Sequence, residues 1–209
     1  MFVFCATDFF ANMIKEIGNL HVSKDADMTN GSPPDMMQTQ EQFIEWALKE
    51  YERPLIGYAQ GFVHDWERAR DVVQDTFIRL CQQDVAKVRD GVKTWLFTVC
   101  RNRALDVLRK DSRLVEMDEK KLGKIPANTV SASSLLEKEE MHQRLEMYLQ
   151  RLTPNQREVV VLKFQQGLSY EEISRVTGLS NGNVGFLLHN ALKRLREWMP
   201  RDLAESNEE

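Results

Sequence analysis

The sequence predicts an all-α protein with two small helical domains joined by a flexible linker. Apolar residues recur at helical spacing over residues 40–110 and 153–199, and no stretch of any length alternates as a β-strand requires. In the second half, Thr153 and Ser169 are followed three positions later by Gln156 and Glu172, a spacing that signals a helix start. The length of 209 residues, with 42% hydrophobic and 29% charged residues, suits a globular protein of one or two domains.

The chain divides into four segments by composition. Residues 1–38 form an N-terminal extension, which we expect to be disordered or to precede the native start at Met28. Its apolar beginning lacks basic residues and contains an acidic one, which argues against a signal peptide. Residues 39–111 form the first domain, residues 112–134 a polar linker, and residues 135–200 the second domain. No apolar run reaches membrane-spanning length, so we expect a cytoplasmic protein without membrane insertion.

The cysteines and the charge narrow the class of protein further. Cys5, Cys81 and Cys100 form no CxxC pair, and two of them lie in apolar helical patterns, which predicts reduced, buried thiols. The net charge of −4 argues against indiscriminate nucleic-acid binding. Basic residues nevertheless outnumber acidic ones by seven to four in residues 151–199 and by six to two in residues 92–113. A local basic surface of this kind is typical of a DNA-binding module.

Three helices are expected in the first domain. The first runs to about residue 62, and Pro54 should bend or interrupt it. The second spans about residues 65–83, a polar loop follows at residues 84–91, and the third spans residues 92–110. The expected core positions are Phe43, Trp46, Ala47, Leu55, Ala59 and Phe62 of the first helix, Ala69, Val72, Val73, Phe77 and Leu80 of the second, and Leu96, Val99, Cys100, Ala104 and Val107 of the third.

The outer faces of the second and third helices differ in chemistry. The second presents an acidic patch with an apolar residue, which suits docking on a basic protein surface, although a solvated face is the plain alternative. Its members are Asp71, Gln74, Asp75, Ile78 and Gln82. The third combines basic, amide and aromatic groups that could stack on and bind unpaired bases, although Trp95 could equally anchor the core. Its members are Trp95, Thr98, Arg101, Asn102, Asp106 and Arg109, while Arg103 falls near the apolar side and should pair or snorkel.

The second domain has the element order of a helix-turn-helix. Thr153 and Ser169 each begin a helix with a capping box, Gly178 ends the short second helix, and Ser180 caps the last one. The last helix has an apolar stripe of Val184, Leu187, Leu188, Ala191, Leu192 and Leu195. Its opposite side carries Asn183, Phe186, His189, Asn190 and Lys193. Asn and His can bind base edges, Phe can contact a thymine methyl, and Lys suits phosphates, so this face favours DNA over plain solvation.

Two sequence blocks together resemble a known family. ERARDVVQDTFIRLCQ followed by VKTWLFTVCRNRALDVLRK is similar to region 2 of the sigma-70 family, and LTPNQREVVVLKFQQGLSYEEISRVTGLSNGNVGFLLHNALKRLR is similar to region 4. The blocks cover about half of the chain in the expected order, and the linker leaves no room for a middle domain. The chain therefore resembles the compact extracytoplasmic-function group of bacterial RNA polymerase sigma factors.

The resemblance implies roles for individual residues and partners. Core RNA polymerase would be bound through its largest-subunit clamp coiled coil by Asp71, Gln74, Asp75 and Ile78, and through its flap by region 4. The −10 element would be recognised and melted by Trp95, Arg101, Asn102, Asp106 and Arg109, with the loop at residues 84–91 capturing a flipped-out base. The −35 element would be bound by Asn183, Gly185, Phe186, His189, Asn190 and Lys193. An anti-sigma factor would be a further partner, and no cofactor, metal or catalytic residue is implied.

The chain departs from the family pattern inside the last helix. Relatives usually carry Thr-Val-Lys/Arg-Ser where this chain has Asn183-Val184-Gly185-Phe186, and Asn190 stands where Arg is common. A Gly in a helix interior costs roughly 1 kcal/mol relative to Ala. We therefore expect an unusual −35 preference.

Three other classes of protein were weighed. An enzyme has little support, because His21, His64, His142 and His189 are scattered and no metalloprotease, nucleotide-binding or nucleophile-elbow motif occurs. A DNA-binding regulator with a helical sensor would explain the second domain but not the first block, and it would bind specific duplex DNA without polymerase. A helical adaptor that binds only protein would be indifferent to DNA at Lys193 and Arg196.

Overall fold

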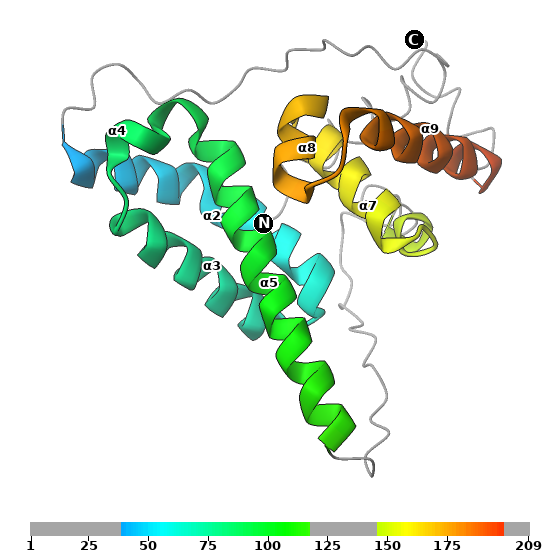
Figure 1. Ribbon diagram of the computed structural model, residues 1–209, viewed down its shortest axis with the longest axis horizontal. Coiled ribbons are helices and arrows are strands. Elements are labelled where there is room, and N and C mark those ends of the chain that lie inside the picture. The colour runs from blue at the N-terminus through cyan, green and yellow to red at the C-terminus, as the bar shows by residue number, and fades with distance from the viewer. Residues whose placement is uncertain (1–38, 118–145, 199–209) are drawn as a thin grey trace, which may run out of the picture. The chain divides into compact units, whose positions relative to one another are not determined.

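The computed structural model describes residues 39–117 and 146–198, and every regular element in these ranges is a helix (Figure 1). This confirms the predicted all-α class. The chain separates into two compact units, which are described one at a time. The expected N-terminal extension and most of the expected linker lie outside the described residues. Within the described ranges, no helix is both long and apolar enough to cross a membrane.

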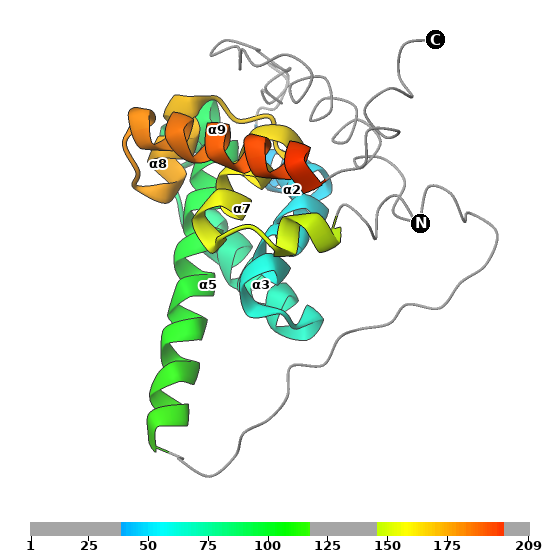
Figure 2. The ribbon, with the colours of Figure 1, turned by 90° about the vertical axis from the view of Figure 1, so that its right-hand side faces the viewer.

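The first domain is a bundle of three long helices with a short connection between the second and third. It consists of α2 (Gln40–Val63), α3 (Trp66–Cys81), α4 (Val85–Val88), the 3-10 turn η1 (Arg89–Gly91) and α5 (Val92–Met117). Helices α2, α3 and α5 each pack on the other two (Figures 1 and 2). Fully buried residues of this core are Phe43, Ala47, Leu55, Ala59, Ala69, Leu80, Leu96, Phe97, Cys100 and Ala104. Burial of each large side chain contributes about 1.5–3 kcal/mol, so apolar packing is what holds the three helices together.

Most predicted core positions are confirmed, but Trp46 and Phe62 of α2 and Val99 and Val107 of α5 are only half-buried. Phe97, which the predicted stripe of α5 omits, is fully buried. The Phe97 ring meets Tyr58 of α2 edge to face, with 5.2 Å between ring centroids. The apolar face of α5 is therefore wider than a single helical stripe, because α5 contacts two helices rather than one.

The predicted interruption at Pro54 is wrong. Helix α2 runs through this residue from Gln40 to Val63 as one element. Proline removes one backbone hydrogen bond and crowds the preceding turn, at about 3 kcal/mol in a helix interior. The next turn buries Leu55, Ile56 and Tyr58. Tertiary packing of these side chains offsets that cost and keeps the helix continuous.

The ends of the first-domain helices follow capping residues. His64 adopts a left-handed conformation with φ of 53° and ends α2, and the Asp65 side chain then accepts a hydrogen bond of 2.9 Å from the Arg68 backbone at the start of α3. The predicted loop at residues 84–91 is instead a helical turn. Asp84 caps it by accepting from the Ala86 backbone at 3.1 Å, and Val88 anchors it in the core.

Helix α5 is longer than predicted. It ends at Met117 rather than near residue 110, so residues 112–117 of the expected linker are helical. Helix propensity rather than an apolar stripe extends it, because this stretch lacks Gly and Pro.

The second domain consists of a helical turn at residues 146–150, α7 (Pro154–Val160) with its π-helical continuation η2 (Val161–Gln165), α8 (Tyr170–Thr177) and α9 (Asn181–Trp198). Both predicted capping boxes are present, at Thr153 and at Ser169. Gly167 and Gly178 have φ of +64° and +75°, which a side chain would strain, and they end the helices before α8 and α9. The predicted helix-turn-helix order is confirmed.

Candidate protein and nucleic-acid interfaces

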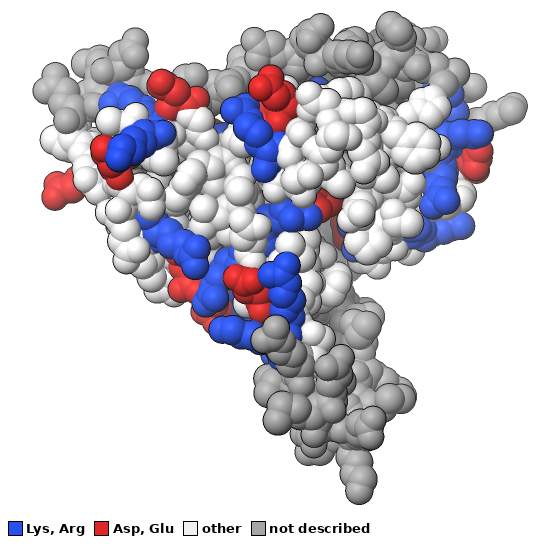
Figure 3. All heavy atoms as spheres, viewed as in Figure 1, with Lys and Arg blue, Asp and Glu red and all other residues white. Residues whose placement is uncertain are grey.

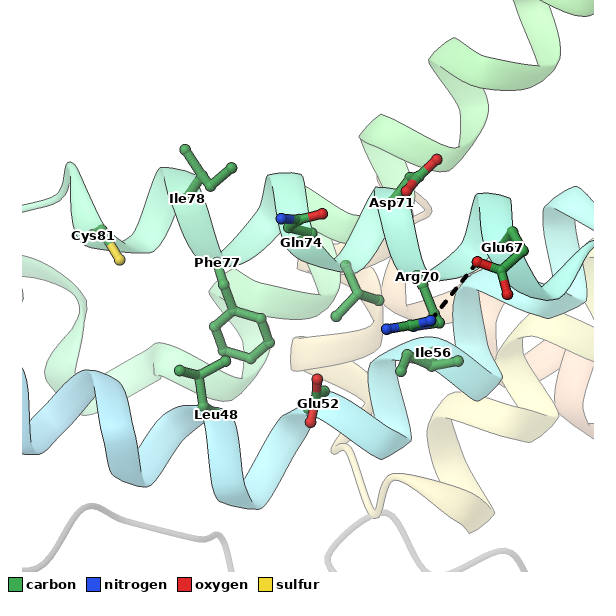
Figure 4. Close-up of a pocket in the computed structure, with 11 residues that line it drawn as sticks. Leu48, Glu52, Ile56, Glu67, Arg70, Asp71, Gln74, Phe77, Ile78 and Cys81 are labelled. Carbon is green, nitrogen blue, oxygen red and sulfur yellow. Dashed lines mark ion pairs between the residues drawn. The ribbon is translucent and has the colours of Figure 1, made fainter.

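A hollow lies along the surface between α2 and α3 (Figure 4). It is lined by Leu48, Glu52 and Ile56 of α2 and by Glu67, Arg70, Asp71, Val73, Gln74, Phe77, Ile78 and Cys81 of α3. Ile78 and Leu48 keep 48% and 37% of their surface exposed, and the acidic residues around them outnumber the basic one. This combination of apolar floor and acidic rim suits a basic helical partner.

Three of the four predicted polymerase-binding residues belong to this hollow. Asp71, Gln74 and Ile78 are exposed and follow one another along α3 (Figure 4). Sequence reasoning missed the contribution of α2 and of Arg70, because helical spacing within α3 cannot show which neighbouring helix completes a groove. The nearby Glu67 carboxylate lies 3.7 Å from the Arg70 guanidinium.

Asp75 lies differently from the prediction. Its carboxylate does not share the outer face with Asp71 but turns toward α5, where Oδ2 accepts from Nε of Arg103 at 2.7 Å and lies 2.5 Å from Nη2. The prediction that Arg103 pairs or snorkels is confirmed by the same contact. A second link between these helices joins Arg68 to Asp111. Asp75 therefore fastens α3 to α5, because a charge-assisted hydrogen bond to a carboxylate holds both side chains in place.

The predicted −10 face of α5 is mixed in charge. Trp95 and Arg101 are half-buried, and Asn102 is exposed. Asp106 and Arg109 form an ion pair of 3.0 Å with each other, so these two residues add no net charge to the face. Figure 3 shows acidic side chains among the basic ones over this region. Aromatic and amide groups near the α4 turn are thus the stronger candidates for contact with unpaired bases.

Local hydrogen bonds and a left-handed glycine define the turn between α8 and α9. Ser174 Oγ donates to the Leu179 carbonyl at 2.5 Å, and Gly178 supplies the left-handed residue of the turn. Ser180 Oγ then accepts from the Asn183 backbone at 3.3 Å and starts α9. Such local bonds fix the entry of the second helix, which in helix-turn-helix proteins is the one that enters the major groove.

The two faces of α9 are as predicted except at Leu187, Gly185 and Asn190, which are all half-buried. The buried residues of the apolar face are Val184, Leu188, Ala191, Leu192 and Leu195. Asn183, His189 and Lys193 are exposed, and Phe186 keeps 66% of its surface exposed.

Gly185 and Asn190 are less exposed than the other predicted members of the DNA-binding face. Gly185 has no side chain, and a Cβ there would lie 3.8 Å from the Tyr170 ring, so the position borders α8. Asn190 is half-buried, and its Nδ2 donates to the Phe186 carbonyl at 2.9 Å. Of the predicted −35 residues, Asn183, Phe186, His189 and Lys193 have the most exposed side chains.

Several basic residues of the second domain are used in its own packing. Arg151 lies over the Trp198 ring at 4.3 Å from its centroid, and Arg157 donates to the carbonyls of residues 149 and 150 at 3.0 Å. Arg194 donates to Gln156 at 3.3 Å. The positive balance counted from sequence is thus partly structural. Arg151 and Arg194 are exposed but are engaged in these packing contacts. The exposed basic residues that take part in none of them are Arg175, Lys193 and Arg196.

The cysteines fit the prediction only in part. Cys81 is exposed, which contradicts the prediction of a buried thiol, and Cys5 lies outside the described residues. Cys100 is buried, and desolvation raises the pKa of its thiol to about 12 despite a hydrogen bond with Thr76 that acts in the opposite direction. Cys81 is the last residue of α3 and lines the hollow between α2 and α3, whereas the neighbouring Leu80 is fully buried.

A helix-turn-helix joined to a separate helical domain with a protein-docking groove defines a transcription protein that binds both DNA and a protein partner. Comparison with known families gives the finer class. Residues 47–114 match the family model of Sigma-70 region 2, and residues 142–195 match that of Sigma-70, region 4. The chain belongs to the sigma-70 family, in its extracytoplasmic-function (ECF) group.

Individual relatives are similar over most of the chain. The ECF RNA polymerase sigma factor SigM of Bacillus subtilis is 28% identical over 153 residues, which cover 73% of this chain and 93% of the relative. The ECF RNA polymerase sigma factor RpoE of Cereibacter sphaeroides is 34% identical over 111 residues, covering 53% of this chain and 60% of the relative. Among solved structures, sigma factor RpoE of Bartonella quintana in complex with the anti-sigma factor NepR matches with a TM-score of 0.56 and 25% identity, over 75% of this chain and 96% of that one.

Proposed function

We propose that this sigma factor binds its partners through three separate surfaces, a division of function between a polymerase-docking groove, a −10 face and a −35 face. Its function as a family member is to bind core RNA polymerase and direct initiation at promoters, which is regulation rather than catalysis. The observation that carries the division is that each matched region exposes a helix face that its own core does not use. We also propose a cytoplasmic location, since core polymerase and promoter DNA are there.

The groove between α2 and α3 is the proposed site for core polymerase. Asp71, Gln74 and Ile78 supply charge, hydrogen bonding and apolar contact on one exposed surface. An interface of this kind gains affinity from the apolar centre, while its charged rim sets the rate and orientation of docking. An anti-sigma factor, such as the one bound to the solved relative, would be a natural competing partner of this chain.

The α4 turn and the adjoining face of α5 are the proposed site for the −10 element. Asn102 is exposed and Trp95 is half-exposed, so both a hydrogen-bonding group and a stacking surface are available. Stacking on an aromatic side chain contributes about 1–3 kcal/mol per unpaired base. The half-exposed Arg101 would add contact with phosphate.

The outer face of α9 is the proposed site for the −35 element. Asn183 and His189 can form hydrogen bonds with base edges in the major groove, and Lys193 and Arg196 can bind phosphates. The fixed turn before α9 would hold these groups in register with the duplex.

Single substitutions on each surface test the division. Asp71→Arg should weaken binding of the chain to core polymerase by at least about tenfold, because it places a positive charge in an acidic groove that meets a basic partner. Glu50→Arg, the same charge change at an exposed residue of α2 that does not line the groove, is the matched control. Binding is measured by titrating fluorescently labelled chain with core polymerase. Equal affinities for the two variants would remove Asp71 from the docking surface.

The −35 face is tested by transcription. His189→Ala should change which −35 sequences support initiation by the holoenzyme while leaving core binding unchanged. The measurement is in vitro transcription from a promoter library randomised in the −35 region. An unchanged sequence preference would exclude His189 from base recognition.

A further inference from the structure

The largest exposed apolar group on the −35 face is an aromatic ring. Phe186 keeps 66% of its surface exposed, more than any other large hydrophobic side chain that is described in residues 39–117 and 146–198. It lies in the second turn of α9, opposite the buried Val184 and Leu188. The domain core makes no use of this ring, and leaving it in water forgoes burial of apolar surface, so a partner of the folded domain is the better explanation.

The residues around Phe186 leave its ring open to that partner. Side chains of a helix lean toward its N-terminus, so the ring lies over the turn that contains Gly182, four positions earlier. A Cβ at Gly182 would meet nothing within 4 Å, so the domain's own packing does not require a glycine there. A glycine that packing does not require permits close approach of the backbone to a ligand. The first turns of a recognition helix are where base edges come nearest.

Phe186 itself has no hydrogen-bonding group, and the exposed polar side chains that flank it on this face are Asn183 and His189, three positions before and after it. Asn190 directs its amide nitrogen to the Phe186 carbonyl at 2.9 Å, and Gly185 carries no side chain. A guanine in front of this part of α9 would present two acceptors, N7 and O6, to a ring that has no donor. Covering them with phenylalanine would leave both without a hydrogen bond, which is unfavourable. The chemistry of the position thus disfavours guanine.

One base offers an apolar group in the major groove, the C5-methyl of thymine. We propose that Phe186 recognises a thymine in the −35 element through contact with this methyl group. This inference rests on the proposed function of α9 and adds the base that its second turn selects. Phe186 is then a specificity-determining residue of this sigma factor.

The test removes the methyl group alone. A −35 sequence is first selected by the holoenzyme from a promoter library randomised in that region, and each thymine on either strand is then replaced by deoxyuridine. At one position the replacement should weaken holoenzyme binding about fourfold, the factor expected for losing burial of one methyl-sized group. With Phe186→Ala, thymine and deoxyuridine at this position should bind equally. With Phe186→Leu, part of the difference should remain.

Lys193→Ala is the matched control on the same face. It should weaken binding to the thymine and deoxyuridine promoters by the same factor, because a phosphate contact carries no base information. The inference is overturned if the selected element has no thymine, if no methyl group matters, or if the methyl effect persists in Phe186→Ala. Failure of the proposed function looks different, since selection would then return random −35 sequences and Lys193→Ala would have no effect.

Discussion

The link between Asp75 and Arg103 gives the sharpest prediction about the first domain. Two nitrogens of the Arg103 guanidinium lie 2.5 and 2.7 Å from one carboxylate oxygen, and the two side chains are 39% (Asp75) and 29% (Arg103) exposed. Hydrogen bonds to charged groups contribute about 1.5–3 kcal/mol, whereas fully exposed pairs contribute about 0–1 kcal/mol. For this intermediate exposure we expect Asp75→Ala to lower the free energy of unfolding by about 1–2 kcal/mol.

Asp75→Arg should destabilise the domain further, because two guanidinium groups would then face each other. Exchanging the charges, with Asp75→Arg combined with Arg103→Asp, should restore a large part of the stability. For a domain of this size, the loss in free energy of unfolding expected for Asp75→Ala corresponds to a fall in melting temperature of roughly 4–16 °C. The affinity for core polymerase should rank these variants in the same order as their stability, because the groove depends on the position of α3.

The assay is urea unfolding of the full chain followed by tryptophan fluorescence. Three of the four tryptophans, Trp46, Trp66 and Trp95, lie in the first domain, so the signal reports mainly on it. A coupling energy within about 0.3 kcal/mol of zero in the double-mutant cycle would refute the structural role of the pair. Recovery of stability without recovery of polymerase binding would show that Asp75 also contacts the partner.

Four further predictions concern thiol reactivity, the pH dependence of stability, a helix cap and a glycine. At pH 8 a thiol-reactive disulfide reagent should modify Cys81 in the native chain and leave Cys100 intact; modification of both at equal rates would contradict the burial of Cys100. Burial raises the pKa of the Cys100 thiol to about 12, so the neutral thiol stabilises the folded chain at pH values below the unfolded pKa near 9, and this contribution is lost as pH rises toward 12. In wild type the free energy of unfolding should therefore fall over this pH range, and Cys100→Ala should make that fall smaller. Thr153→Ala removes the capping box of α7 and should cost about 1 kcal/mol, seen as a lower melting temperature of the second domain. Gly182→Ala should raise helix stability by roughly 0.5–1 kcal/mol yet weaken promoter binding, and unchanged promoter binding would argue against close approach of the backbone to DNA.

Local signals predicted the second domain well. The capping residues and the glycines of the helix-turn-helix act within a few positions of themselves, so Thr153, Ser169, Gly178 and Ser180 could be identified without knowledge of any distant contact. The apolar stripe of α9 was equally clear, because one helix face packs on one core.

Features that depend on neighbouring helices were harder to predict. Pro54 was expected to bend or interrupt α2, and its lack of interruption could not be predicted because the sequence does not show how much side-chain burial surrounds Pro54. Helical spacing placed Asp75 on the outer face with Asp71, because only the position of α5 reveals Arg103 opposite it. The groove between α2 and α3 needed both helices, and so its α2 side was missed. The hydrogen bond from Asn190 to the Phe186 carbonyl could not be predicted either, because it depends on the side-chain rotamer.

The central claim is that the chain recognises promoters as part of RNA polymerase rather than alone. The most direct measurement is binding of one promoter fragment, selected by the holoenzyme, to the free chain, to core polymerase and to the two together, at physiological salt. Only the combination should bind the promoter tightly and make bases of the −10 element reactive to permanganate. Tight, specific binding by the free chain, with no gain from core polymerase, would contradict the claim and favour a DNA-binding regulator.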